Sequence, residues 1–342
     1  MKGWAETRQV YAALAAACAQ GRRAALATVI RVRGSAYRHP GAKLVVVDDD
    51  THMGNVSGGC LEGDVREVAR RVIATGVAER RRYCGGADEI AAWDLGVGCE
   101  GEVELLIEPL GDARDAVQAA LAAEAPFVTV TALAGERVTG FEVATGAAAA
   151  ALADGGTRLE TDGDAARFIE VHEPAPRLVV VSAGDDAIPL ARIGDLVGFR
   201  VVVVDRRPGL LTAARFPAPI RRVEATADEV MARLDLDADD AVVVMTHHFG
   251  DDTDYLDALR TSRVRYLGLL GPRQRTERIV TRLEATGPFD RARLFGPVGL
   301  DIGTDGAEQV ALAVIAEVLA VRSGRAARSL RDRIAPIHAD VG

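Results

Sequence analysis

Lysine is nearly absent from this chain of 342 residues, because Lys2 and Lys43 are the only lysines among its 41 basic residues. Acidic residues outnumber basic residues by 50 to 41, which gives a net charge of −9 and a pI near 5.3. This balance argues against nucleic acid or an anionic membrane as a partner, because both require a basic face. No apolar run reaches the roughly 18 residues that a membrane-spanning helix needs. We therefore expect a cytoplasmic protein that holds any anionic ligand through local charges.

Cysteine is scarce as well, and none of the four cysteines forms a CxxC pair. Their spacing fits neither a disulfide framework nor a zinc ribbon, so we expect free thiols. Cys60 in VSGGCLEGDV (residues 56–65) and Cys99 in LGVGCEG (residues 95–101) both lie in glycine-rich loops. A thiol at the start of a helix experiences a partial positive charge, which makes the sulfur nucleophilic or metal-binding. The alternative is a small buried residue at a tight turn.

The glycines beside these two thiols would let a ligand approach the backbone closely. We predict that the two loops contact a cofactor and that the two sulfurs are candidate metal ligands. The candidate residues of the loops are Ser57, Gly58, Gly59, Cys60, Gly98 and Cys99.

The order of apolar patterns predicts two α/β domains. Residues 1–172 combine helical spacing at 6–20 and 61–76 with β-rich runs at 24–32, 42–48 and 102–110, which indicates a mixed α/β domain with glycine-rich loops. The stretch HEPAPR (residues 172–177) is typical of a linker. Residues 177–322 alternate continuous apolar runs with amphipathic helices, which predicts a doubly wound, Rossmann-like parallel sheet, and residues 323–342 form an Arg-rich tail.

The first turn of the second domain, VSAGDDAIPL, partly matches a dinucleotide fingerprint. Ser182 occupies the first glycine position and Gly184 the second, and Asp205 follows 21 residues after Gly184, where an acid could bind a ribose diol. Two aspartates at the phosphate end, Asp185 and Asp186, would repel an anion. Gly184 and Asp205 are therefore candidate contacts of NAD(P), and the alternative is a Rossmann scaffold without a nucleotide.

Three further residues are candidate ligand contacts. His247 and Arg273 follow predicted strands at their carboxyl ends, where such folds build their sites. Lys43 could supply local positive charge, and it is favoured because the chain otherwise avoids lysine. The other histidines are expected to have structural roles, namely His39, His52, His172 and His248.

Eight segments in order resemble the XdhC/CoxI family, the maturation factors of molybdenum hydroxylases such as xanthine dehydrogenase and carbon monoxide dehydrogenase. The segments lie at residues 34–46, 54–65, 96–110, 181–193, 245–256, 266–279, 296–322 and 336–338, and they include GNVSGGCLEGDV and GPVGLDIGTDGAEQVALAVIAEVLAVR. The family's motif cysteine corresponds to Cys60, and its second glycine-loop cysteine corresponds to Cys99. Ser182 departs from the glycine that many relatives carry there, which weakens the expectation of a nucleotide.

The resemblance implies a chaperone that binds the molybdenum cofactor, aids its sulfuration and inserts it into an apoenzyme. The implied partners are a molybdenum hydroxylase and a cysteine desulfurase-like sulfur donor, and we also consider a homodimer. The main alternative is an NAD(P)-dependent oxidoreductase that uses His247 as acid or base and Cys60 as a redox or substrate-binding thiol. A nucleotide-sensing regulator without turnover is the third hypothesis.

Overall fold

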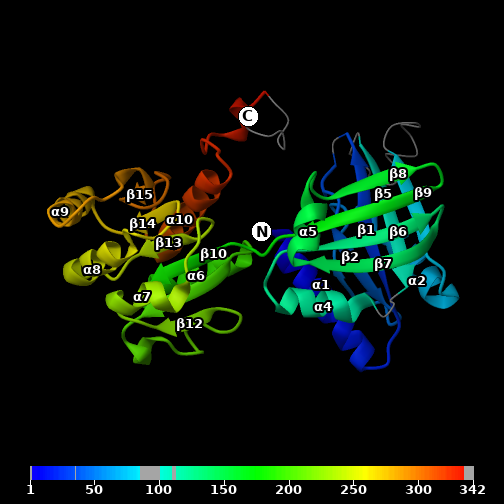
Figure 1. Cartoon of the computed structure of the whole chain (residues 1–342), viewed down its shortest axis with the longest axis horizontal. Coiled ribbons are helices and arrows are strands. Elements are labelled where there is room, and N and C mark those ends of the chain that lie inside the picture. Colours follow the sequence, from blue (N-terminus) through cyan, green and yellow to red (C-terminus); the bar gives the residue numbers. More distant parts are fainter. Residues whose placement is uncertain (1, 35, 85–100, 110–112, 335–342) are drawn as a thin grey trace. The chain divides into compact units, whose positions relative to one another are not determined.

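The computed structural model describes residues 2–34, 36–84, 101–109 and 113–334. It divides the chain into two compact units, Met1–Pro174 and Ala175–Gly342 (Figure 1). Over the described ranges, no helix has both the length and the apolar character that crossing a membrane requires. Each unit is built around its own sheets and helices, and the two are described separately below.

The first unit contains two antiparallel sheets. One sheet has the order β3-β2-β1-β5-β4, and the other has the order β7-β6-β9-β8. The elements are α1 (Lys2–Ala19), β1 (Ala24–Arg33), β2 (Lys43–Val47), β3 (His52–Gly54), α2 (Glu62–Thr75), β4 (Glu79–Cys84), β5 (Glu102–Pro109), α4 (Ala113–Ala122), β6 (Phe127–Ala134), β7 (Arg137–Thr145), α5 (Gly146–Ala153), β8 (Arg158–Asp162) and β9 (Ala165–His172).

Alternation along the strands separates the two faces of each sheet in this unit. Val29 and Leu44 belong to the core that α2 covers through Val65 and Val68. The opposite face of the same sheet packs on the second sheet, whose outer side is covered by α5. Side chains that point between the two sheets are therefore enclosed, and polar ones among them require partners inside the protein.

The second unit is a doubly wound parallel sheet with the strand order β12-β11-β10-β13-β14-β15. Its elements are β10 (Arg177–Val181), α6 (Ala187–Leu196), β11 (Arg200–Asp205), the 3₁₀ turn Pro208–Leu210, β12 (Arg221–Glu224), α7 (Ala227–Leu234), β13 (Ala241–Val244), α8 (Phe249–Leu259), β14 (Tyr266–Leu269), α9 (Arg273–Glu284), the 3₁₀ turn Arg291–Arg293, β15 (Leu294–Phe295), α10 (Ala307–Arg322) and the 3₁₀ turn Leu330–Asp332.

Valine runs in this sheet are buried on both faces, which is the pattern of a parallel sheet between helix layers. Val179, Val202 and Val242 face a layer that includes α7, α8 and α9. Helices α6 and α10 pack together on the other face, where a Cβ at Gly194 would lie 2.7 Å from Leu178 Cδ2. The predicted α/β architecture with a Rossmann-like second domain is thus confirmed.

Candidate functional site

Cys60 lies in the segment between β3 and α2, two residues before the helix begins at Glu62. We call residues 55–61 the Cys60 loop. Its left-handed residue is Gly59, with φ of 115°, a conformation that disfavours side chains with a Cβ atom. The Cys60 side chain is partly exposed and packs against the core beneath α2. The thiol therefore stands at the start of a helix, as the spacing predicted.

Two side chains hold the Cys60 loop in shape. The Glu62 carboxylate accepts hydrogen bonds from the Val56 N–H at 3.1 Å and from the Ser57 N–H at 2.8 Å. Ser57 Oγ donates to the same carboxylate and accepts from the N–H groups of Gly59 and Leu61. Burial tends to raise the pKa of Glu62, but its hydrogen bonds with Ser57 and Val56 outweigh burial and lower this pKa. The carboxylate thus stays ionised as a brace for the loop.

Within the described part of the chain, the N–H groups of Gly58 and Cys60 in this loop have no hydrogen-bond acceptor. Free N–H groups beside a helix start favour thiolate and other anionic groups. No cluster of three or more metal-binding side chains occurs among the described residues, so Cys60 belongs to no such cluster there. Cys99 and Gly98 lie outside the described residues, and their predicted roles stay predictions.

Lys43 lies at the start of β2 and points between the two sheets of the first unit, where it forms an ion pair with Glu170 of β9. Its ammonium also donates to the Gly41 carbonyl oxygen at 3.1 Å. Both side chains are less than one tenth exposed. Burial tends to raise the pKa of Glu170, but the Lys43 charge lowers it below its ordinary value. The scarce lysine is therefore half of a buried ion pair that joins two sheets.

His172 extends this row of polar groups along β9, because residues two apart on a strand share a face. His172 Nε2 lies 3.6 Å from a Glu170 oxygen and 3.2 Å from Thr129 Oγ1. The imidazole also stacks on the Phe127 ring, with centroids 4.3 Å apart. Burial lowers the pKa of His172 to about 4. The imidazole is therefore neutral near pH 7.

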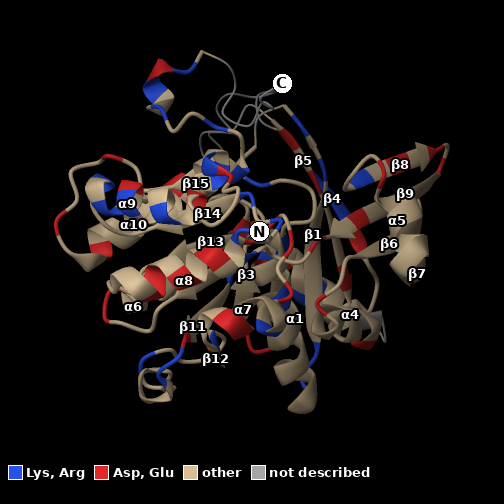
Figure 2. Cartoon of the chain, turned by 60° about the vertical axis from the view of Figure 1, so that its left-hand side comes forward, with Lys and Arg blue, Asp and Glu red and all other residues tan. Residues whose placement is uncertain are grey.

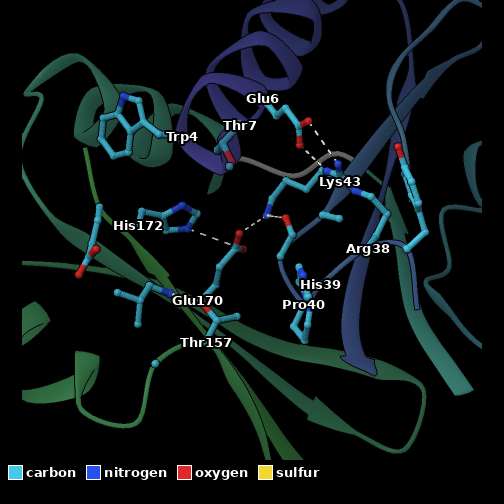
Figure 3. Close-up of a pocket in the computed structure, with 17 residues that line it drawn as sticks. Trp4, Glu6, Thr7, Arg38, His39, Pro40, Lys43, Thr157, Glu170 and His172 are labelled. Carbon is cyan, nitrogen blue, oxygen red and sulfur yellow. Dashed lines mark hydrogen bonds and ion pairs between the residues drawn. The ribbon is translucent and has the colours of Figure 1, made fainter. Parts of the chain in front are cut away.

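A pocket of about 530 Å³ opens beside these residues, and we call it the Lys43 pocket. Figure 3 shows Lys43, Glu170 and His172 pointing toward one another, with Arg38 paired to Glu6 on a neighbouring wall. Helix α1 contributes further lining, including the buried indole of Trp4. The pocket thus combines charged and aromatic groups from α1, β2, β9 and the segment before β2.

The Lys43 pocket and the Cys60 loop meet at Tyr37. The Tyr37 side chain lines the pocket, and a Cβ added at Gly58 would lie 3.6 Å from Tyr37 Cγ. Tyr37 of the pocket lining thus lies near Gly58 of the Cys60 loop, whereas the Lys43 side chain points between the sheets and Cys60 packs on the opposite face of the same sheet.

His247 occupies the opening of the parallel sheet in the second unit. The strand order reverses between β10 and β13, and such a switch point is where doubly wound folds place ligands. His247 follows β13 and contacts Asp186, which follows β10, through a 2.9 Å hydrogen bond from Nε2 to Oδ2. His247 also has a left-handed backbone, with φ of 62°, which is strained for a residue with a Cβ. The pair therefore bridges the switch point.

Arg275, in the first turn of α9, supports His247 through the backbone. Its guanidinium donates to the His247 carbonyl oxygen at 3.3 Å and pairs with the buried Asp252 carboxylate. Burial raises the pKa of Asp252, although hydrogen bonds from Thr246 oppose the shift. Acidic residues gather on α8 and basic ones on α9, as Figure 2 shows. Arg273 is exposed at the start of α9, so the arginine that contacts His247 lies two residues further on.

The two nucleotide candidates of the second unit also lie at this edge of the sheet. Asp205 ends β11, and its carboxylate accepts hydrogen bonds from the Ala183 N–H at 2.7 Å and from Arg207. Burial tends to raise the pKa of Asp205, but the Arg207 hydrogen bonds and the Ala183 N–H lower it. The Gly184 N–H is taken by Ser182 Oγ at 3.0 Å. The predicted NAD(P) site stays a prediction, and a dinucleotide there would have to compete with these internal hydrogen bonds.

Sequence reasoning missed Trp4, Glu170 and Arg275, and it assigned His172 a structural role only. Trp4 lies before the helix predicted at 6–20, whereas α1 begins at Lys2, and Arg275 is one of many arginines. The sequence AARFIEVH did contain a signal for this site. Phe168, Glu170 and His172 occupy every second position of the strand and therefore share one face. Polar residues on an otherwise apolar face indicate a buried polar site.

Comparisons with family models match both units. Residues 178–318 match the XdhC Rossmann domain, and residues 17–84 match the XdhC and CoxI family. A curated relative from Bacillus subtilis (strain 168), named as a probable xanthine dehydrogenase subunit, is 30% identical over 316 residues, which are 87% of this chain and 93% of the relative.

Two further proteins are similar over most of their length. "Molybdenum cofactor insertion chaperone PaoD" from Escherichia coli (strain K12) is 26% identical over 306 residues, which are 88% of this chain and 84% of PaoD. A crystal structure from Bacillus halodurans, described as a xanthine dehydrogenase, is 27% identical with a TM-score of 0.76, covering 93% of this chain and 97% of that one.

Proposed function

The chain belongs to the XdhC and CoxI family, and from this membership we propose that it binds the molybdenum cofactor as a chaperone. In this role it receives the cofactor, aids the exchange of an oxo for a sulfido ligand, and inserts the cofactor into a molybdenum hydroxylase such as xanthine dehydrogenase. Its partners are the apoenzyme and a cysteine desulfurase-like sulfur donor, and the chaperone acts as a monomer or a homodimer. The cofactor is cargo in this scheme.

The observation that carries the proposal is the similarity to PaoD, whose name is that of a molybdenum cofactor insertion chaperone, over 88% of this chain. The relative from B. subtilis, named for xanthine dehydrogenase, supports a hydroxylase as the recipient. The Cys60 loop supplies suitable chemistry, because sulfur ligands bind molybdenum readily and a partly exposed thiol can release it again. A site that takes up and releases a cofactor must be accessible from solvent, and the Cys60 side chain is partly exposed.

The test is retention of the cofactor by purified protein. Wild type and the Cys60→Ala variant are incubated with molybdenum cofactor, passed through gel filtration, and assayed for molybdenum and pterin in the protein fraction. We expect co-elution with wild type and loss of most molybdenum from the variant, because the variant lacks the sulfur ligand. Cys84→Ala is the matched control, since Cys84 is an exposed thiol at the end of β4 outside the Cys60 loop.

A second readout is activation of a molybdenum hydroxylase apoenzyme by the loaded protein. Loaded wild type should activate the apoenzyme, and Cys60→Ala should do so poorly. Absence of cofactor from both proteins after gel filtration would refute the chaperone function. Equal retention and equal activation by wild type and Cys60→Ala would remove Cys60 from the mechanism.

A further inference from the structure

A second cavity lies in the parallel-sheet unit, at the edge of the sheet opposite the switch point. Its walls come from the segment between α8 and β14 and from the segment that leads into β15, so it stands at the amino ends of these two strands. We call it the arginine pocket, because its lining includes Arg260, Arg263, Arg265 and Arg293 together with one carboxylate, Asp290. The proposed chaperone function uses none of these residues.

Two of the four arginines hold the wall of the pocket. The Arg293 guanidinium donates to the carbonyl oxygens of Leu259 at 3.2 Å and Arg260 at 2.5 Å, which satisfies groups that are left free at the end of α8. Arg260 pairs with Asp257 and donates to the Leu283 carbonyl oxygen at 3.0 Å. Both guanidiniums are engaged inside the protein, so their role in the pocket is structural.

Arg263 and Arg265 differ from these two in being free for a ligand. Both are exposed, and neither has an ion pair or a side-chain hydrogen bond within the described part of the chain. Val264 between them belongs to the core and is 1% exposed, so its two neighbours turn outward into the same pocket. The order of apolar and charged residues in SRVRYL (residues 262–267) therefore places two unpaired guanidiniums on one wall.

The charges of the arginine pocket do not cancel. Among the described residues that line it, Asp290 is the one carboxylate, and Asp257 offsets Arg260 from outside the lining. Two positive charges stay uncompensated even when both carboxylates are counted. Like charges gathered at one place on the surface attract anions, and a planar guanidinium matches two oxygens of a phosphate group. The pocket therefore favours an anion with two negative charges.

A phosphate monoester fits this requirement, because it carries a charge of about −1.5 to −2 at pH 7, whereas a carboxylate carries a single charge. The cavity volume of about 460 Å³ leaves room beyond a phosphate group and lies in the range of small-molecule sites. None of the described residues that line the pocket is aromatic, so a nucleobase or a pterin would find no ring to stack on. The rest of the ligand is therefore polar and non-aromatic.

We propose that the arginine pocket binds a sugar phosphate, with Arg263 and Arg265 as the residues that contact the phosphate group. The exposed Asp290 carboxylate accepts a hydrogen bond from the Ala292 N–H at 3.0 Å through one oxygen, and its other oxygen is an acceptor for sugar hydroxyls. This site is separate from the cofactor cargo, and it stands whether or not the chaperone function is correct.

The experiment measures binding of glucose 6-phosphate to the full chain by isothermal titration calorimetry. Wild type should bind it, and Arg263→Gln and Arg265→Gln should each bind about tenfold more weakly, the effect of one lost charge-assisted hydrogen bond. The double variant Arg263→Gln/Arg265→Gln should show no binding. The fold should persist in all three variants, because both side chains are exposed and have no partner among the described residues, and circular dichroism checks this.

Two controls separate the pocket from general charge effects. Arg221→Gln removes an exposed arginine of β12 that lies outside the pocket lining and has no ion pair in the described ranges, and it should bind glucose 6-phosphate like wild type. Glucose without phosphate should not bind to wild type, since the two free guanidiniums recognise the phosphate group.

Each contrary result overturns a stated part of the proposal. No binding of glucose 6-phosphate by wild type, or equal binding by wild type and the folded double variant, would refute the site. Equal affinity for inorganic phosphate and glucose 6-phosphate would reduce it to an adventitious anion site. Tighter binding of adenosine monophosphate would overturn the sugar phosphate in favour of a nucleotide. Retention of the molybdenum cofactor should be the same in the double variant and wild type, and its loss from the variant would overturn the separation from the cargo.

Discussion

His172 makes the stability of the first unit depend on pH in a way that a single substitution isolates. The imidazole is buried between two sheets, where burial lowers its pKa to about 4 from the ordinary value of 6.5. Because the folded-state pKa lies below the unfolded one, the unfolded chain takes up a proton first as pH falls. The stabilisation is complete above about pH 6.5 and is lost progressively toward pH 4.

The size of the effect follows from the two pKa values. Going from about pH 7.5 to about pH 5, the difference in proton uptake at His172 lowers the free energy of unfolding by about 2 kcal/mol. His172→Gln cannot titrate, and its side chain still offers Thr129 Oγ1 a hydrogen-bond partner. Its stability relative to wild type should therefore improve by about 2 kcal/mol between these two pH values. Any constant cost of the substitution cancels in this comparison.

Urea unfolding at the two pH values measures this change. Tryptophan fluorescence does not report on the second unit, because the sequence has no tryptophan from Ala175 onward. His52→Gln is the control, since His52 is an exposed histidine on β3. A stability difference between His172→Gln and wild type that does not change with pH would refute the reasoning.

Two further predictions concern other buried or strained residues. Lys43→Met should lower the free energy of unfolding by about 3–5 kcal/mol, because it leaves the buried Glu170 carboxylate without a counter-charge, and Lys43→Met/Glu170→Leu should recover most of this loss in urea unfolding. Equal losses in the single and double variants would contradict the buried-pair argument. His247→Gly should be more stable than His247→Ala by about 1 kcal/mol in thermal unfolding, because glycine adopts φ of 62° without strain. Equal stability of the two His247 variants would contradict the argument that the backbone of His247 is strained.

The fold class could be predicted because its signal is local. The apolar runs that became β10, β11 and β13 are buried on both faces, and a covered parallel sheet is the arrangement that accommodates such strands. The hydrophobic pattern is less regular in the region that forms β7, α5, β8 and β9. Many positions on β7 and β8 are exposed, so the sequences of these two strands show little apolar alternation. For that reason no strand was predicted over either of them.

The sequence predicted only those parts of the candidate site whose position depends on residues close together in the chain. The position of Cys60 before a helix follows from the residues around it, and the family resemblance drawn from the same motifs is confirmed by the comparisons. Lys43 stood out by its rarity, but its partner Glu170 lies 127 residues further along the chain. No spacing rule reaches over that distance, since the contact depends on how two sheets stack.

The sequence by itself determined the α/β class, the helix start beside Cys60 and the valine strands of the second unit, because apolar periodicity and turn residues act over a few positions. Tertiary structure alone decided that Lys43, Glu170 and His172 form one buried row beside Trp4. It also decided that Asp186 and His247 bridge the switch point. These groups come from different elements, and the enclosure that shifts the pKa of His172 exists only after those elements have packed.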